Sequence, residues 1–250
     1  MIRNTAVTVC GPLNVNKLGV TYVHEHLMVK PQLPDEYYIP YTLDDEAAST
    51  EETRSFSAAG GETLVEMTPI NYGRNVKAYQ RIAQATGVHV ICCTGFHKQL
   101  FMPPWFGDKT DGELYDILMN EVTNGLDDTE IHPGVIKLGP SFEEVTAAEK
   151  RSIEAVARVH RDTGIPISTH CDKGTMGMDQ LRLLEKHGVD PKNVLLWQTK
   201  STLIIIFSSR NAANCRKQAQ FANPVTIVFF IVPTLYRKSQ QNAAIYSSQT

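Results

Sequence analysis

The stretch "VTYVHEHLMV" (residues 20–29) places two histidines, His24 and His26, at the end of an apolar run that we interpret as a β-strand. Side chains on a strand alternate between its two faces, so residues two positions apart project to the same face. Both imidazoles could therefore reach one metal ion, and catalytic zinc sites combine imidazole with carboxylate ligands. Glu25 projects to the opposite face and is expected to orient an imidazole or to cap the strand end. A pair of hydrogen-bonded structural histidines is the alternative at this point.

Outward from this strand, short apolar runs alternate with helical patterns. Strands are expected at residues 18–26, 62–68, 88–95, 134–139, 165–170 and 193–197, and helices at 43–61, 74–87, 110–126, 146–164 and 178–188. Short continuous apolar strands are typical of parallel strands that are covered on both faces. The series predicts an α/β fold, which is either a (β/α)8 TIM-type barrel or an open doubly wound sheet.

Four polar residues favour the barrel. His24, His26, Lys137 and His170 each lie at the carboxyl end of a predicted strand, where barrel enzymes build their active sites. No GxGxxG motif follows the first strand, so the usual dinucleotide signature is absent. Lys137, in "GVIKLG", is unusual because burial would lower its pKa and leave a neutral amine that can capture carbon dioxide as a carbamate. A lysine that extends to the surface is the commoner alternative.

The overall composition is that of an ordinary globular protein. Hydrophobic residues make up 42% and charged residues 20% of the 250 residues. Five cysteines without paired or CxxC spacing, and an N-terminus without a secretory pattern, indicate a reducing, cytoplasmic setting. The apolar runs are shorter than the ~20 residues that span a membrane. Because the basic residues form no dense cluster, we expect neither a membrane nor a nucleic acid as partner.

Composition changes abruptly near residue 190. Residues 191–250 contain no Asp, Glu, Gly or His and seven Lys or Arg, so they carry +7 against −10 for residues 1–190. A shifted reading frame or an unspliced intron is expected to cause such a joint loss. We therefore predict a partial barrel over residues 1–196 and an atypical tail over residues 197–250.

Residues from about 9 to 196 resemble the phosphotriesterase family of the amidohydrolase superfamily, in particular its lysine-bearing phosphotriesterase-like and lactonase-like branch. The matching stretches are "LGVTYVHEHL", "LVEMT", "GVIKLGPS", "VTAAEK", "TGIPISTHCDKGTMGMDQLRLLEKHGVD" and "NVLL". The resemblance implies a (β/α)8 barrel, of which about six βα units are present here, with two divalent metal ions. His24 and His26 would hold one metal, carbamylated Lys137 would bridge both, and His170 would hold the other. Zinc is expected, with manganese or cobalt as alternatives.

The reaction that the resemblance implies is hydrolysis of a small-molecule phosphotriester, lactone or amide by hydroxide held between the metals. Lys137 would then be a catalytic residue as well as a bridging ligand. A homodimer is possible for such a protein. No nucleic acid or membrane is expected to take part.

The sequence departs from the family pattern after the sixth strand. Family members continue there with Gly-His-x-Asp, whereas this chain has Trp197, Gln198, Thr199 and Lys200. The family's last ligand, an aspartate that ends strand eight and accepts the proton, has no counterpart because Asp190 is the last acidic residue. We therefore expect weak or no activity in this chain. The alternative is an inactive relative that serves as a binding or regulatory protein.

Four further residues near predicted strand ends have open roles. Glu66, which ends "LVE", either supports the site or is a buried, hydrogen-bonded acid. His97 either lines the substrate pocket or is solvated on its loop. Cys171 is a stray metal ligand or, as we expect, an inert buried thiol. Asp172 could take the role of the missing aspartate only after a rearrangement.

Overall fold

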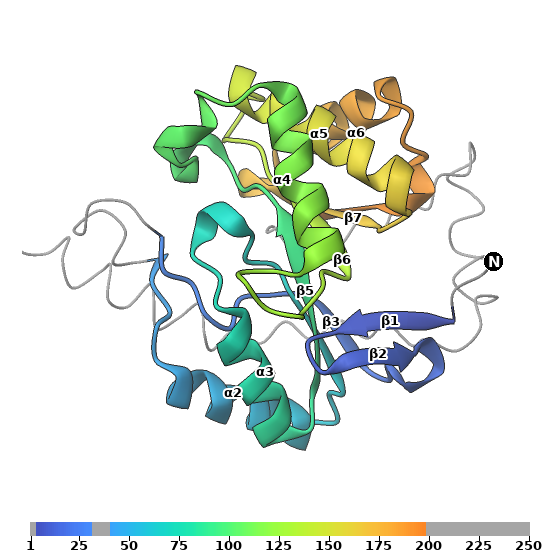
Figure 1. Cartoon of the computed structure of the whole chain (residues 1–250). Helices are drawn as coiled ribbons and strands as arrows, with labels where there is room; N and C mark the ends of the chain where they lie inside the picture. Colours follow the sequence, from blue (N-terminus) through green and yellow to red (C-terminus); the bar gives the residue numbers. More distant parts are fainter. Residues whose placement is uncertain (1–3, 32–40, 199–250) are drawn as a thin grey trace, which may run out of the picture.

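Six parallel strands form one curled sheet in the computed structural model, which describes residues 4–31 and 41–198 (Figure 1). The spatial order β3-β4-β5-β6-β7-β8 follows the order of the chain. The strands are β3 (Thr21–Glu25), β4 (Thr63–Glu66), β5 (His89–Gly95), β6 (Val135–Leu138), β7 (Ile167–Cys171) and β8 (Val194–Gln198). This half-barrel of βα units confirms the predicted incomplete barrel. The tail from residue 199 onward lies outside the described residues.

The five predicted helices are confirmed, and each follows one strand (Figure 1). They are α2 (Glu46–Ala58), α3 (Val76–Thr86), α4 (Asp111–Asn124), α5 (Ala147–Thr163) and α6 (Gly177–Lys186). Thr110 and Thr146 each form a capping box with the glutamate three residues later, which satisfies free amide groups of the first turn. Within the described part of the chain, no helix is both long and apolar enough to cross a membrane.

Short 3-10 helices occupy several of the connections. They are η1 (Val15–Lys17), η3 (Ile70–Tyr72), η4 (Gln99–Phe101), η5 (Pro104–Phe106), η6 (Asp172–Gly174) and η7 (Pro191–Asn193). Of these, η3, η4 and η6 follow β4, β5 and β7, so they lie beyond the carboxyl ends of the strands. This is the end of the sheet at which the candidate ligands were predicted to meet.

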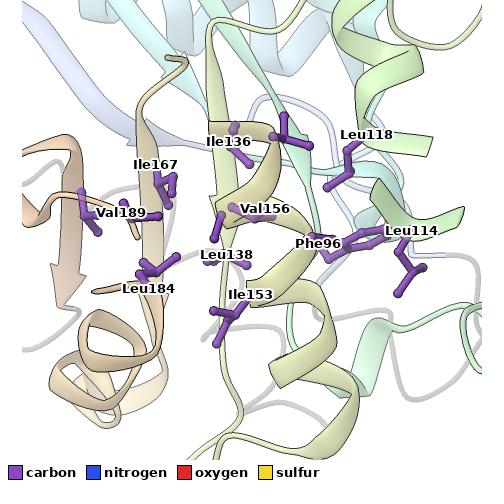
Figure 2. Close-up of a cluster of buried hydrophobic side chains, with 14 of the residues drawn as sticks. Phe96, Leu114, Leu118, Ile136, Leu138, Ile153, Val156, Ile167, Leu184 and Val189 are labelled. Carbon is purple, nitrogen blue, oxygen red and sulfur yellow. The ribbon is translucent and has the colours of Figure 1, made fainter. Parts of the chain in front are cut away.

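One large apolar cluster lies between strands β6 to β8 and helices α4 to α6 (Figure 2). Ile136 and Leu138 of β6 belong to this cluster and are at most 1% exposed. Because side chains alternate along a strand, Lys137 between them projects to the other, concave face of the sheet. Packing of the helices therefore decides which residues of β6 point toward the interior of the half-barrel.

An antiparallel hairpin at the amino ends of the strands was not predicted. It pairs β1 (Thr5–Thr8) with β2 (Gly11–Asn14), and the amide of Val9 in its turn donates to the carbonyl of Val90, at 2.8 Å. A cavity of about 1190 Å³ lies beside the hairpin, bordered by Lys77 and Pro133 among others. None of the four predicted metal ligands lines this cavity. Cavity size therefore does not locate the functional site of this chain.

Candidate metal centre

The parallel sheet brings the four predicted ligands together at the carboxyl ends of its strands. The ring centroids of His24 and His26 are 5.5 Å apart, and those of His24 and His170 are 6.5 Å apart. Nζ of Lys137 lies 3.1 Å from Nε2 of His24, although 113 positions separate the two residues in the sequence. Residues from β3, β6 and β7 thus surround one point inside the half-barrel.

Lys137 is fully buried, with 0% of its surface exposed. The alternative of a lysine that extends to the surface is therefore wrong. Among the residues that the structure describes, its ammonium group forms no ion pair, and its hydrogen bond is with His24. Burial lowers the pKa of Lys137 to about 8, although Cys93 and Glu66 act in the opposite direction. A larger fraction of neutral amine exists at neutral pH than in an exposed lysine.

The three candidate histidines are neutral at neutral pH. Burial, followed by the charge of Lys137, lowers the pKa of His24 and of His26 well below the usual range. The same two causes, in the same order, lower the pKa of His170 to about 3. A neutral imidazole keeps a lone pair on one ring nitrogen, which is the form that binds a metal ion.

His26 is held by two residues at the end of β4. Oγ1 of Thr68 lies 2.8 Å from Nδ1 of His26, and Oε1 of Glu66 lies 3.8 Å from the same nitrogen. Glu66 also accepts hydrogen bonds from the amides of Leu27, at 3.0 Å, and Thr68, at 2.8 Å. Burial raises the pKa of Glu66 to about 7 despite these bonds. Glu66 is therefore both a buried, hydrogen-bonded acid and a neighbour of a candidate ligand.

Thr68 was not predicted as a site residue. Its signal was its place two residues after β4, at the same end of the sheet as the predicted ligands. When Nδ1 of His26 donates to this hydroxyl, Nε2 keeps the lone pair that binds a metal ion. Thr68 is thus a residue that orients a candidate ligand.

Glu25 lies on the opposite face of β3, as predicted. Its Oε1 accepts a hydrogen bond of 2.8 Å from the backbone amide of His26, so it caps the end of the strand. The side chain borders a groove between β3 and α2 together with Tyr22 and Phe56. Burial raises the pKa of Glu25 to about 7. Glu25 stabilises the backbone at the site and does not face the candidate ligands.

The structure shows the surroundings of three residues for which the sequence left the role undecided. His97 is only 5% exposed, so the alternative of a solvated loop histidine is wrong. Cys171 is buried beside Gln180 of α6, with Nε2 of Gln180 3.7 Å from the sulfur, in agreement with an inert thiol. Asp172 pairs with Lys98, at 2.6 Å between Oδ2 and Nζ. This ion pair joins the segments that follow β5 and β7.

The donor set fits a divalent cation only if Lys137 contributes a ligand. Within residues 4–31 and 41–198, no three His, Cys, Asp or Glu side chains are arranged to hold one ion. His24 and His26 offer two neutral imidazoles beside the amine of Lys137, and a carbamate on that amine would add a carboxylate-like oxygen donor. The backbone of Gln198 aligns with Cys171 at the end of β8, where the resemblance predicts the family's next histidine.

Similarity to known proteins identifies the family of this chain. Residues 4–202 match the sequence profile of the phosphotriesterase family. The chain belongs to the phosphotriesterase family. The family match extends four residues beyond β8, the last described strand.

Relatives in the phosphotriesterase family are about one third identical to this chain over the aligned residues. This chain is 33% identical over 183 residues to the phosphotriesterase homology protein of Escherichia coli (strain K12). The match covers 73% of this chain and 62% of that protein. This chain is also 31% identical over 210 residues to the phospho-furanose lactonase of Mycoplasmopsis synoviae (strain 53). That match covers 78% of this chain and 60% of that protein. The chain thus spans about three fifths of the length of these relatives.

The fold agrees with solved structures of the family. A crystal structure of a lactonase from Listeria monocytogenes matches with a TM-score of 0.71 at 29% identity, covering 77% of this chain and 64% of that chain. The six-stranded half-barrel therefore corresponds to an incomplete (β/α)8 barrel.

Proposed function

We propose that this protein is a metal-dependent hydrolase that acts on small-molecule lactones, phosphotriesters or amides. The observation that carries the proposal is Lys137, which is fully buried with Nζ 3.1 Å from Nε2 of His24. A buried lysine without an acidic partner costs folding free energy, so its presence favours a functional role. Membership of the phosphotriesterase family and similarity to lactonases support hydrolysis as that role.

The first step that we propose is carbamylation of Lys137. The neutral amine attacks carbon dioxide, a nitrogen–carbon bond forms, and one amine proton leaves to solvent. The product carries a negative charge where the free lysine would carry a positive one. The burial that lowers the pKa of Lys137 to about 8 increases the fraction of amine that can react.

The metal centre that we propose uses the four predicted ligands. His24 and His26 would hold one divalent ion, His170 would hold a second, and carbamylated Lys137 would contribute a ligand to both; zinc is the first choice, with manganese or cobalt as alternatives. When bound, such ions polarise the bond under attack and lower the pKa of water. With Nδ1 of His26 donating to the hydroxyl of Thr68, Nε2 would be available to such an ion.

Turnover is expected to be weak in this chain. Trp197, Gln198, Thr199 and Lys200 replace the family's Gly-His-x-Asp. Glutamine is a poorer metal ligand than imidazole, so the ion on His170 would be held less tightly. No feature of the described residues favours the alternative of an inactive binding or regulatory protein. The homodimeric state and the cytoplasmic location of this protein remain predictions from the sequence.

Hydrolysis by the purified full-length chain tests the proposal. We would add zinc, manganese or cobalt and follow hydrolysis of an aromatic lactone and an aryl phosphotriester. His24→Gln should abolish any metal-dependent rate. His132→Gln should not, because Nδ1 of His132 lies 3.1 Å from the carbonyl of Val122, away from the site. A rate that does not depend on metal or on His24 would contradict the proposal.

The carbamate has a separate test. Incubation with 13C-labelled bicarbonate should produce a carbamate carbon signal in the NMR spectrum of the wild-type chain, and Lys137→Met should lack it. A labelled signal that persists in Lys137→Met would assign the carbamate to another amine. If the wild-type chain shows no carbamate signal, Lys137 does not have the proposed ligand role.

A further inference from the structure

His97 is a buried histidine to which neither the family resemblance nor the proposed reaction gives a role. It is the second residue after β5, and only 5% of its surface is exposed. Its Nδ1 is buried and has no hydrogen-bond partner among the described residues. A buried nitrogen without a partner costs folding free energy and calls for an explanation, such as an ion that is bound there.

The structure holds His97 in place from several sides. Asn71 accepts a hydrogen bond from the amide of His97, at 2.7 Å, and donates one to its carbonyl, at 3.2 Å. The ring stacks on Phe101, with centroids 5.2 Å apart and an angle of 10° between the planes. Tyr72 packs edge-on against the same ring, with centroids 4.8 Å apart. This support fixes the direction in which the nitrogens of His97 point, as a metal ligand requires.

The ring of His97 packs against that of a candidate ligand, His170. Their ring centroids are 5.0 Å apart, which is closer than the 5.5 Å between His24 and His26. Gly139 lies against the ring of His97 and the Cβ of His170: a Cβ atom at that position would be 2.7 Å from Nδ1 of His97 and 3.1 Å from Cβ of His170. A larger residue at position 139 would therefore collide with His97 on the side of Nδ1.

We propose that His97 and His170 bind one divalent cation together, so that His97 supplies the second imidazole that the sequence after β8 lacks. The cation class is the one that suits imidazole ligands, namely zinc or cobalt. This inference rests on the proposed function, because it names a ligand of the second ion of that centre. It differs from the family pattern, in which the second imidazole belongs to the Gly-His-x-Asp motif. Here that place holds Gln198 and its neighbours.

Cobalt binding to the full-length chain tests this assignment. We would measure bound Co²⁺ per chain by equilibrium dialysis and follow its visible absorption, for the wild-type chain and for His97→Phe. Phenylalanine keeps a ring that can stack on Phe101 and removes the unpartnered nitrogen, so the variant should fold. His97→Gln is a second variant, whose fold would be checked by circular dichroism. His89→Gln is the matched control, because His89 lies at the opposite end of β5.

Two Co²⁺ ions per wild-type chain, one in both His97 variants and two in His89→Gln would support the assignment. Where one ion stays weakly bound in the variants, its affinity should fall by at least about tenfold. Two ions in His97→Phe with unchanged affinity would overturn the assignment and leave the proposed function intact.

Two other outcomes are also decisive. If the wild-type chain binds a single ion that is lost in His24→Gln but kept in His97→Phe, the assignment to His97 and His170 fails while the first metal site stands. If the wild-type chain binds no cobalt, the proposed metal-dependent function fails as well.

Discussion

Lys137 and Arg74 are both buried cations, and the structure treats them in opposite ways. The side chain of Arg74 is 2% exposed and pairs with Glu121 and Asp127, with 2.7 Å between Nη2 and Oδ1 of Asp127. Burial alone would lower the pKa of Arg74, but the two carboxylates outweigh it and raise the pKa. Lys137 has no carboxylate partner among the described residues, and burial lowers its pKa to about 8.

The difference separates a cation that two carboxylates neutralise from a lysine that has no carboxylate partner among the described residues. Arg74 lies outside the concave face, where it ties the start of α3 to Glu121 of α4 and to the carbonyl of Cys93. The carboxylates of Glu121 and Asp127 neutralise the charge of Arg74, so this cation has a structural role. Lys137 is placed between neutral imidazoles, where a neutral amine is available for chemistry. Equal burial therefore does not mean equal function, because the partners decide the protonation state.

The largest expected effect is on stability, from Arg74→Met. The substitution leaves Glu121 buried without its cation, which should lower the free energy of unfolding by about 3–5 kcal/mol. Urea denaturation of the metal-free chain measures the change. Arg81→Met is the control, because Arg81 and Glu46 form an exposed pair and should matter much less. An equal loss in both variants would show that the burial of Arg74 has no energetic consequence.

Lys137→Met should have the opposite effects, with a large loss of hydrolysis and no loss of stability. Metal-dependent hydrolysis should fall by at least about 100-fold, because even residues that only support a ligand change metal affinity by about 10- to 100-fold. Stability of the metal-free chain should stay the same or rise, since an apolar side chain replaces a buried amine. Lys150→Met, on the exposed side of α5, is the control for both assays. A marked loss of stability in Lys137→Met would make Lys137 a structural cation like Arg74.

Addition of metal should stabilise the chain through the site of Lys137 and not through the Arg74 cluster. Zinc at about 100 times its dissociation constant should add about 2.7 kcal/mol to the free energy of unfolding, and a chelator should reverse the gain. Thermal unfolding with and without zinc measures it. Lys137→Met should show little gain, whereas Arg74→Met should keep it. The reverse pattern would move the metal away from the candidate centre.

The smallest expected effect comes from Thr68→Val. Loss of the hydroxyl that lies 2.8 Å from Nδ1 of His26 should weaken cobalt binding by about tenfold, or about 1.4 kcal/mol. Thr63→Val is the matched control, because Thr63 is a buried threonine at the other end of β4 whose hydroxyl donates to the carbonyl of Leu18. Unchanged cobalt affinity in Thr68→Val would remove Thr68 from the site.

Local patterns were enough to predict the βα series. The capping box at Thr146 and the glycine at residue 164 defined α5 to within one residue of its observed ends. The hairpin of β1 and β2 was missed, because its two short strands are half exposed and carry little hydrophobic periodicity. Its place depends on contacts such as that of Val9 with Val90, which are distant in the sequence.

Some residues of the candidate site were likewise predicted from the sequence, and others were not. His24, His26, Lys137 and His170 were found from the sequence, since polar residues at the ends of apolar strands stand out in a βα series. Thr68, Asn71 and the burial of His97 were not, because their positions depend on loops that fold back over the ends of the strands.

The sequence by itself determined that this chain forms βα units and which side chains are candidates for metal binding. Strand periodicity and residue chemistry are local properties, so they can be read one segment at a time. Only the tertiary structure decided which cation is paired and which is not. Burial and partner distance set the pKa of Lys137 and of Arg74, and both arise when segments far apart in the chain pack against one another.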